Sequence, residues 1–315
     1  MRDEGILVTG GAGFIGSHLV DLLLESGYTV YALDNLSTGK LENLEEAEGS
    51  PNFRFIRGDV TRSLSDVLGG SALGGGPPIS AIFHLAARVD VTTSLERPLD
   101  DALTNYTGTI NVLDYAIKND IRWVTFSSSA AVYGDVRSLP VSEDDPLLPL
   151  SPYGLNKMAS ENLLRIYGEN YNINTASLRF FNVYGPRQDP GNPYSGVISK
   201  FMEWGKNGQP LIIYGDGSQT RDFVYVKDVA AALHLAYRCG ATGAFNIGTG
   251  TETSISRLAE EVSRISGNDL PKVHMEERKG EISRSQACVD KFERVCEFRP
   301  STSLKQGLRE TYRSI

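Results

Sequence analysis

The chain has 315 residues, enough for two domains or for one large α/β domain that carries a smaller lobe. Apolar residues make up 40% of it, charged residues 22%, and 32 residues are glycine, which excludes a disordered or a fibrous chain. Asp and Glu outnumber Lys and Arg by 39 to 31, and the formal net charge of −8 argues against a broad basic surface for nucleic acid or for an anionic membrane.

The first half of the chain alternates short β-rich runs with amphipathic helical stretches, which is typical of a parallel sheet covered by helices on both faces. Strands are predicted at 5–9, 28–34, 53–59, 81–87, 121–127 and 174–180. Helices are predicted at 15–25, 98–118 and 153–170. We therefore expect a doubly wound α/β fold of the Rossmann type. The glycine- and proline-rich stretch 69–78 is expected to be a surface loop.

The sequence changes character near Phe181, where a loop-like stretch precedes a predicted helix at 197–206, a short strand at 211–214 and a loop through Arg221. A helix is predicted at 227–239, and a strand at 244–247 that could return to the main sheet. We expect a smaller α/β lobe in this part of the chain, interleaved with the first domain.

Cysteine usage and the N-terminal stretch bear on the compartment. The three cysteines, Cys239, Cys288 and Cys296, are odd in number and lack metal-ligand spacing, which argues against a disulfide framework or a structural zinc site and favours a reducing compartment. The stretch before Gly10 is too short for a signal-peptide core, and no apolar run approaches the length of about 20 residues that spans a membrane. We expect a cytoplasmic protein without a metal site, a membrane anchor or a nucleic-acid partner.

A glycine-rich turn joins the first predicted strand to the first predicted helix, in GILVTGGAGFIGSHLV over residues 5–20. Gly10, Gly13 and Gly16 allow a tight turn, let the backbone approach a pyrophosphate, and let the helix pack on the strand, while the helix N-terminus faces the anion. Asp34 ends the second strand, where a carboxylate binds the adenosine ribose hydroxyls and repels a 2′-phosphate. These features predict NAD as the cofactor. The alternative is a glycine-rich turn that binds no ligand.

Ligands of such sheets bind at the carboxyl ends of the strands, so residues that follow the third and fourth strands are expected to line the cofactor groove. They are Asp59, Val60, Leu85, Ala86 and Ala87.

Three serines, Ser127, Ser128 and Ser129, end the fifth predicted strand, and Tyr153 and Lys157 follow on a helix. Their i, i+4 spacing places Tyr153 and Lys157 on one helical face, about 6 Å apart at Cβ. A tyrosine has a pKa of about 10, so it acts as a base at neutral pH only when a cation such as Lys157 stabilises its phenolate. Ser129 would then hydrogen-bond the reacting hydroxyl. The alternative is a chance Tyr-x-x-x-Lys pattern and serines that merely end a strand.

Motifs along nearly the whole chain resemble the extended short-chain dehydrogenase/reductase family, and within it most of all the UDP-glucose (UDP-galactose) 4-epimerases. The stretches that carry the resemblance are TGGAGFIGSHL (9–19), DNLSTG (34–39), HLAA (84–87), NYTGTINVL (105–113), SSSAAVYG (127–134), PYGLNK (152–157), LRFFNVYGP (178–186), YGDGSQTRDFVYVKD (214–228), FNIGTG (245–250) and ERKGE (277–281). The resemblance implies an NAD-binding Rossmann domain over 1–180 and about 223–250. It implies a nucleotide-sugar-binding lobe over 181–222 and 251–315.

The resemblance also implies site residues. The catalytic residues would be Ser129, Tyr153 and Lys157. The cofactor would be bound by Gly10, Gly13, Phe14, Ile15, Gly16, Asp34, Asn35, Ser37, Thr38, Gly39, Asp59, Val60, Leu85, Ala86, Ala87, Asn105, Ser127, Tyr153, Lys157 and Phe180. The substrate would be bound by Ser129, Asn182, Val197, Ile212, Tyr214, Arg221, Arg278, Glu281 and Ser285.

In this assignment Asn182 and Arg221 bind the diphosphate, Arg278 binds the diphosphate or the ribose, and Glu281 binds the ribose hydroxyls. The uracil is surrounded by Val197, Ile212 and Tyr214. Arginine forks match diphosphate oxygens bidentately. Arg221 has an alternative role as an interdomain ion-pair partner of the adjacent acids.

Three positions depart from the family pattern. Glu281 stands where an aspartate is more usual, which keeps the carboxylate but lengthens its reach, and Phe180 replaces a common tyrosine near the nicotinamide. Ser285 occupies a position whose bulk is associated in the family with the size of the sugar pocket. Its small side chain is expected to leave room for an N-acetyl group.

The resemblance implies NAD-dependent interconversion of UDP-glucose and UDP-galactose through a 4-keto intermediate, a step of galactose metabolism, with UDP-GlcNAc and UDP-GalNAc as further candidate substrates. Ala130 and Ala131 stand where relatives that eliminate water or lose carboxylate carry acids, which favours epimerisation. One alternative is 4-epimerisation of UDP-glucuronate or a TDP-hexose, and another is a non-catalytic NAD-sensing regulator, although such proteins have typically lost the tyrosine or the lysine. A homodimer is expected, with helices 98–118 and 153–170 forming a four-helix bundle.

Overall fold

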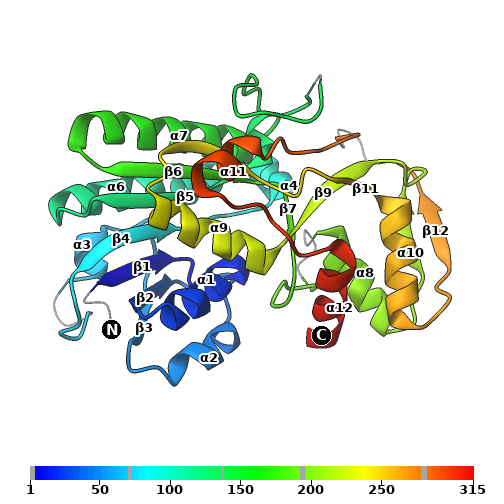
Figure 1. The fold of residues 1–315 in the computed structure, drawn as a ribbon, viewed down its shortest axis with the longest axis horizontal. Helices are drawn as coiled ribbons and strands as arrows, with labels where there is room; N and C mark the ends of the chain where they lie inside the picture. The colour runs from blue at the N-terminus through cyan, green and yellow to red at the C-terminus, as the bar shows by residue number, and fades with distance from the viewer. Residues whose placement is uncertain (1–3, 70–72, 137, 192–195, 278–281) are drawn as a thin grey trace. The chain divides into compact units, whose positions relative to one another are not determined.

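The computed structural model describes residues 4–69, 73–136, 138–191, 196–277 and 282–315 (Figure 1). The chain divides into two compact units. Unit 1 consists of Met1–Gly134, Pro146–Arg179 and Ala230–Phe245, and unit 2 of Asp135–Asp145, Phe180–Val229 and Asn246–Ile315. The functional division into a cofactor-binding and a sugar-binding lobe, with the boundaries given above, stays a prediction.

A seven-stranded sheet in the order β10-β6-β5-β4-β1-β2-β3 is the centre of unit 1. Its strands are β1 (Gly5–Thr9), β2 (Thr29–Asp34), β3 (Phe53–Arg57), β4 (Ile79–His84), β5 (Trp123–Ser129), β6 (Asn174–Phe180) and β10 (Gly243–Ile247). The pairs β1–β2, β1–β4, β2–β3 and β4–β5 are parallel. The strand order reverses between β1 and β4, which is the place where ligands bind in doubly wound sheets. The predicted Rossmann fold is confirmed, and so is the return of the strand near residue 244 to the main sheet.

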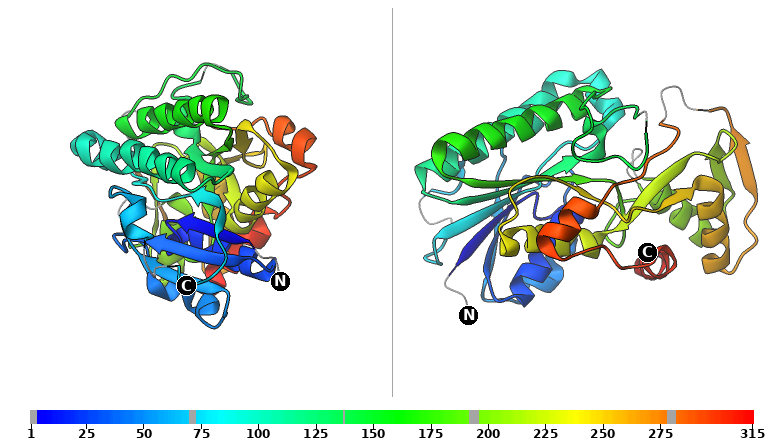
Figure 2. Two further views of the ribbon diagram at one scale, coloured as in Figure 1. Left: turned by 90° about the vertical axis from the view of Figure 1, so that its left-hand side faces the viewer. Right: turned by 45° about the horizontal axis from the view of Figure 1, so that its top comes forward.

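Helices cover both faces of this sheet, with α6 and α7 on one face and α1 on the other (Figures 1 and 2). The helices of unit 1 are α1 (Phe14–Glu25), α2 (Glu45–Glu48), α3 (Leu64–Val67), α4 (Val91–Glu96), α5 (Pro98–Ala102), α6 (Gly108–Lys118) and α7 (Pro152–Tyr171), with α9 (Val226–Cys239) continuing into it from unit 2. Because both faces are covered, all five residues of β1 are buried. Helix α7 begins with Pro152 after the cap Ser151, whose hydroxyl accepts a hydrogen bond from the Gly154 amide at 3.1 Å.

The predicted helix 98–118 is interrupted in the structure, which corrects the sequence analysis. A π-helical turn, η2 (Leu103–Thr107), separates α5 from α6. The carbonyl oxygen of Asn105 accepts hydrogen bonds from the hydroxyls of Thr109 and Ser160 at 2.7 and 3.0 Å. The side-chain contact from α7 is a tertiary interaction that helical periodicity does not disclose. Strand β4 also ends before the predicted limit, and β5 extends beyond it to Ser129.

Unit 2 holds a three-stranded sheet in the order β11-β9-β7 and a two-stranded parallel sheet of β12 and β8. Its strands are β7 (Asn182–Tyr184), β8 (Leu211–Tyr214), β9 (Thr220–Tyr225), β11 (Glu252–Ser254) and β12 (Lys272–Met275), and its other helices are α8 (Val197–Lys206), α10 (Ile255–Ser266), α11 (Asp290–Cys296) and α12 (Leu304–Ser314). The predicted helix 197–206 and strand 211–214 are confirmed. The buried carboxylate of Asp222 accepts hydrogen bonds from the amides of Thr249, Gly250 and Ala287, which joins three segments of this unit.

The cysteines differ from expectation. Cys239 and Cys296 are disulfide-bonded and Cys288 is a free thiol, so the argument against disulfides was wrong. Bond formation depends on the approach of two sulfur atoms in space, which cysteine counts and spacings do not reveal. The argument for a reducing compartment therefore loses its support. Within the described ranges, no helix is long and apolar enough to cross a membrane.

Candidate active site

The turn between β1 and α1 has the geometry that its glycines predict. Gly10 has a φ of 71°, in the left-handed region, and a Cβ added there would lie 2.7 Å from the Ala86 nitrogen. A Cβ at Gly16 would lie 2.0 Å from the Gly10 carbonyl oxygen. Larger residues would therefore force the strand, the turn and the helix apart.

The N-terminus of α1 suits a diphosphate. Gly13 is its N-cap residue and supplies no side-chain hydrogen bond to the first turn. Phe14 and Ile15, which begin the helix, are half-buried. A first turn without a side-chain cap presents amide donors and the positive end of the helix dipole to an anion. This part of the structure fits the pyrophosphate of NAD.

Asp34 lies at the end of β2 beside this turn. Its Oδ1 accepts a hydrogen bond from the Leu36 amide at 2.8 Å, and its Oδ2 accepts one from the Ala12 amide at 3.1 Å. Burial raises the pKa of Asp34, while these two hydrogen bonds lower it. A Cβ at Gly39 would lie 2.9 Å from both carboxylate oxygens, so a glycine there keeps space open in front of them. The remaining lone pairs can accept ribose hydroxyls.

The loop after β2 is organised by Asn35 and Asp59. The side-chain amide of Asn35 donates to Asp59 at 2.9 Å, and its carbonyl accepts from the Ser37 amide at 2.9 Å. Burial raises the pKa of Asp59, but hydrogen bonds from Thr61 and Asn35 outweigh it and hold the pKa below its usual value. Thr38 is exposed on the same loop.

The end of β4 lies next to the end of β1, and the lining of the cofactor groove by Leu85, Ala86 and Ala87 stays a prediction. Leu85 and Ala86 donate their amides to the carbonyl and hydroxyl oxygens of Thr9 at 3.1 and 3.2 Å. Leu85, Ala86 and Ala87 are half-buried, whereas Val60 is buried.

Sequence reasoning missed His84, which holds this edge together. Its Nδ1 lies 2.7 Å from the Thr9 hydroxyl, and its Nε2 lies 3.2 Å from the Thr109 hydroxyl. Burial, and then the charge of Lys157, lower the pKa of His84 to about 3, so the imidazole is neutral at ordinary pH. Its position at the end of a predicted strand, directly before Leu85, was the feature of the sequence that could have indicated this role.

The three catalytic candidates lie together in unit 1. Ser129 is the last residue of β5, and Tyr153 and Lys157 share a face of α7. The Lys157 ammonium lies 5.9 Å from the centroid of the Tyr153 ring and donates to the Ser127 carbonyl oxygen at 2.7 Å. Lys157 is 2% exposed and Tyr153 8%. The Ser129 hydroxyl oxygen also accepts from the Ala131 amide at 3.2 Å, which orients it at the start of the turn that follows β5.

Burial dominates the protonation of this group. It raises the pKa of Tyr153 to about 12. A hydrogen bond with Ser129 lowers this pKa, and the charge of Asp101 raises it further. Burial lowers the pKa of Lys157 to about 7, although the charges of Asp101 and Glu161 raise it. Tyr153 therefore keeps its proton at neutral pH, and a further positive charge beside it would favour the phenolate.

Sequence reasoning missed Asp101, a buried carboxylate of α5 that contacts α7. Its oxygens accept from the side-chain amides of Asn156 and Asn105 at 2.7 and 3.0 Å. Asn105 also donates to the Arg88 carbonyl oxygen at 2.9 Å and accepts from the Arg88 amide at 3.0 Å. The predicted cofactor contact of Asn105 is therefore restricted to the remaining acceptor capacity of its carbonyl.

The described substrate candidates other than Ser129 lie in unit 2, as does the buried Phe180. Asn182 is exposed at the start of β7, Val197 begins α8, and Ile212 and Tyr214 share one face of β8. Arg221 in β9 donates to the Thr220 carbonyl oxygen at 2.8 Å. Ser285 is half-buried. Arg278 and Glu281 lie outside the described residues.

Comparisons with known proteins agree with this geometry. The family model described as "NAD dependent epimerase/dehydratase family" matches residues 6–248. A UDP-glucose 4-epimerase of Mycolicibacterium smegmatis is 39% identical over 308 residues, which cover 97% of this chain and 96% of that protein.

Two solved structures are similar along their whole length. The UDP-N-acetylglucosamine 4-epimerase from Methanobrevibacter ruminantium M1, in complex with UDP-N-acetylmuramic acid, has a TM-score of 0.93 and 37% identity, covering 100% of this chain and 98% of that one. The UDP-glucuronic acid 4-epimerase from Bacillus cereus, in complex with UDP-glucuronic acid and NAD, has a TM-score of 0.88 and 33% identity, covering 98% of each chain.

Proposed function

Because this chain belongs to the NAD-dependent epimerase/dehydratase family and uses NAD as its cofactor, we propose that it interconverts UDP-glucose and UDP-galactose by inversion at C4 through a 4-keto sugar. The observation that carries the proposal is the cluster of Ser129, Tyr153 and Lys157, at the carboxyl edge of a sheet whose first turn fits a dinucleotide. A paired tyrosine and lysine beside such a turn suit proton transfer to and from a sugar hydroxyl.

Each residue of the cluster has a distinct task. In the ionised form that the positive charge of bound NAD would favour, Tyr153 removes the proton of the sugar 4-hydroxyl and returns it after inversion, and Ser129 holds the same oxygen by a hydrogen bond. Lys157 supplies positive charge near the phenol and anchors the end of β5 through Ser127. When bound, NAD supplies the acceptor and then the donor of the hydride at C4.

Epimerisation requires that the sugar turns while the nucleotide stays bound. We assign the binding of the diphosphate to Asn182, Arg221 and Arg278. The uracil is assigned to Val197, Ile212 and Tyr214, which lie in α8 and β8. Binding energy concentrated on the unreactive nucleotide allows the hexose to rotate and present its other face. Ala130 and Ala131 form the turn after Ser129 and carry no acid for elimination or decarboxylation.

A second candidate substrate pair is UDP-GlcNAc and UDP-GalNAc. The small side chain of Ser285 and the similarity to a UDP-N-acetylglucosamine 4-epimerase favour it.

The test is to incubate the purified protein with UDP-glucose, UDP-GlcNAc, UDP-glucuronate and a TDP-hexose, and to separate the products. Conversion of UDP-glucose to UDP-galactose supports the proposal. Conversion of UDP-glucuronate or the TDP-hexose alone would assign a different 4-epimerase. Bound NAD that no nucleotide sugar reduces would favour a non-catalytic NAD sensor.

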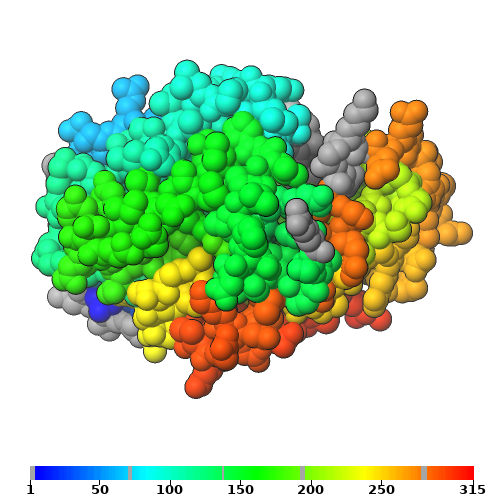
Figure 3. Space-filling model, turned by 90° about the horizontal axis from the view of Figure 1, so that it is seen from above, coloured from blue at the N-terminus to red at the C-terminus, as the bar shows by residue number. Residues whose placement is uncertain are grey.

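We also propose a homodimer. Large apolar side chains are exposed in α4, α5 and η2, at Leu95, Leu99 and Leu103, and on α7 at Leu155. The segments 91–107 and 152–171 lie next to one another on the face shown in Figure 3, in cyan and green. Exposed apolar surface of this kind suits a helix-to-helix interface between two copies. Sedimentation analysis of wild type and Leu99→Glu tests the proposal, and a wild-type monomer would contradict it.

A further inference from the structure

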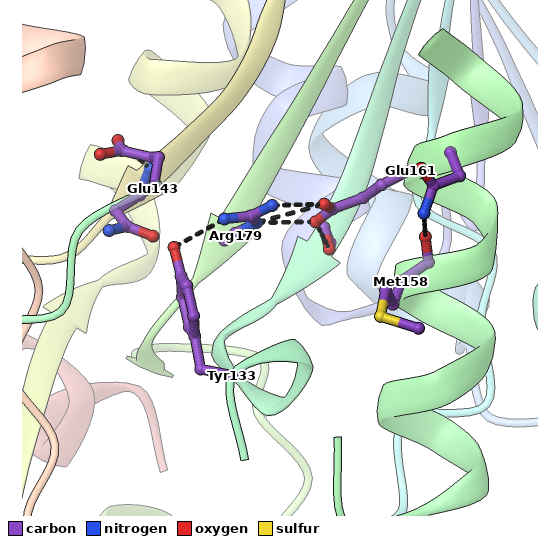
Figure 4. A network of polar contacts seen from close by, with 8 residues as sticks. Tyr133, Glu143, Met158, Glu161 and Arg179 are labelled. Atoms are coloured by element: carbon purple, nitrogen blue, oxygen red, sulfur yellow. Dashed lines mark hydrogen bonds and ion pairs between the residues drawn. The ribbon is translucent and has the colours of Figure 1, made fainter. Parts of the chain in front are cut away.

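A buried ion pair between Arg179 and Glu161 joins β6 to α7, and Glu161 lies four residues after Lys157 on the helix (Figure 4). The Arg179 Nε lies 2.9 and 3.2 Å from the two Glu161 carboxylate oxygens, and its Nη2 lies 2.7 Å from Oε2. The two side chains are only 5% and 8% exposed. Burial of a charged pair is costly, and its replacement by apolar residues is often neutral or stabilising. The presence of this pair is therefore weak evidence for a purely stabilising role.

The outer atoms of the pair bind two further side chains. The Ser128 hydroxyl donates to Glu161 Oε1 at 2.5 Å, and Arg179 Nη1 donates to the Tyr133 hydroxyl at 2.8 Å. The guanidinium also lies over the Tyr133 ring, 4.9 Å from its centroid. Ser128, Tyr133 and both charged residues are buried.

Ser128 and Tyr133 are the two ends of a short segment, residues 128–133. It contains Ser129 and the turn η3 (Ala130–Val132), which carries Ala130 and Ala131. The ion pair, which belongs to α7 and β6, thus contacts both ends of the segment, while Lys157 holds the preceding residue through the Ser127 carbonyl oxygen. The first turn of α7 also lies against the middle of the segment, since a Cβ at Gly154 would come within 2.6 Å of the Ala131 carbonyl oxygen.

We propose that Glu161 and Arg179 are positioning residues, which with Ser128 and Tyr133 clamp the segment 128–133 and so place the Ser129 hydroxyl against the sugar oxygen and Tyr153. The proposal rests on the proposed function, because it concerns the placement of a group in that reaction. A displacement of about 1 Å at a reacting group lowers turnover by up to about 100-fold.

The main test cuts the connections and keeps the ion pair. In the double variant Ser128→Ala/Tyr133→Phe, Glu161 and Arg179 can keep their mutual hydrogen bonds, so we expect the fold to be retained, which the thermal midpoint checks. We expect kcat to fall about 10- to 100-fold with little change in KM, because the nucleotide is bound elsewhere while Ser129 is misplaced. Arg165→Gln is the matched control, since it breaks an exposed ion pair with Glu169 on the same helix. It should keep wild-type kcat.

A second variant, Glu161→Leu/Arg179→Met, replaces the pair by apolar side chains. We expect a thermal midpoint near that of the wild type and a similar loss of kcat. A purely structural role predicts normal kcat in every variant that folds. Wild-type kcat in both folded double variants would overturn the proposal.

Hydrogen exchange separates this proposal from the proposed function. If the wild type converts no nucleotide sugar, the proposed function has failed, but the clamp is still tested by exchange. The Ala131 amide donates to the Ser129 hydroxyl and the Tyr133 amide to the Ala130 carbonyl oxygen. In Ser128→Ala/Tyr133→Phe both amides should exchange faster, while those of β1 keep their wild-type rates. Unchanged exchange at both amides would overturn the clamp in that case.

Discussion

The Lys157 ammonium donates a hydrogen bond of 2.7 Å to the backbone carbonyl oxygen of Ser127. This bond connects the sixth residue of α7 to the end of β5, two residues before Ser129. The lysine therefore contacts the strand end, in addition to its proposed role as a cation beside Tyr153. The proposed chemistry depends on both, since the phenol and the serine hydroxyl must meet the same sugar oxygen.

Replacement of Tyr153 by phenylalanine should abolish most activity. Tyr153→Phe removes the group that transfers the proton and leaves a ring of nearly the same volume in a buried position, so kcat should fall about 10²- to 10⁴-fold. The NAD content of the purified variant should equal that of the wild type. Near-normal turnover would show that another group transfers the proton.

A methyl group at position 39 should weaken cofactor binding. In Gly39→Ala the added Cβ would lie 2.9 Å from both oxygens of Asp34, and overpacking of this kind costs about 1–3 kcal/mol, which corresponds to about 5- to 150-fold in affinity for NAD. Gly49→Ala is the control, because a Cβ there meets nothing within 4 Å and Gly49 has a φ of −74°. NAD titration of both variants measures the difference. Equal affinities would contradict the assigned ribose site.

Neutral His84 should make the protein sensitive to acid. Burial holds its pKa at about 3 in the folded state, below the ordinary value of 6.5, so between these values only the unfolded chain binds the proton. The free energy of unfolding therefore falls as pH falls below 6.5, by about 1.4 kcal/mol per pH unit from this group.

Urea unfolding at several pH values between 4 and 7 measures this effect. His84→Asn keeps a polar side chain near the two threonine hydroxyls but has no proton to bind, so its unfolding free energy should depend less steeply on pH than that of the wild type. His274→Asn, at an exposed position, is the control and should keep the wild-type slope. Equal slopes in wild type and His84→Asn would count against the buried, neutral imidazole.

The size of residue 285 should set the preference between plain and acetylated sugars. Ser285→Tyr should lower kcat/KM for UDP-GlcNAc about tenfold or more by steric exclusion of the acetyl group, and leave UDP-glucose nearly unaffected. Ser283→Tyr, two residues earlier and exposed, is the control. Failure of the wild type to convert UDP-GlcNAc at a detectable rate would remove this second substrate pair.

The parts of the fold and site that were predictable are governed by local rules. The glycines at 10, 13 and 16 are required by the close packing of one turn. The spacing of Tyr153 and Lys157 places both on one face of the helix, whatever surrounds it. The strand order then follows from the alternation of strands and helices with right-handed crossovers.

The features that were missed depend on contacts between distant segments. Ser128 looked like one more residue at a strand end, and only the fold brings Glu161 and Arg179 to it. The π-helical turn at Asn105 depends on contacts with Arg88 and Ser160, which helical periodicity does not encode.

Protonation at the site illustrates the same limit. A neighbouring lysine alone predicts a lowered pKa for Tyr153, whereas its burial, a property of the whole fold, raises that pKa to about 12.

The most direct test of the proposed reaction follows the hydrogen at C4. UDP-glucose that carries deuterium at C4 is incubated with the protein in ordinary water, and the product is analysed by NMR. The account predicts UDP-galactose that retains the deuterium at C4, since the hydrogen leaves carbon and returns within one active site. Loss of the deuterium to water, or recovery of UDP-glucose alone with no UDP-galactose formed, would contradict it.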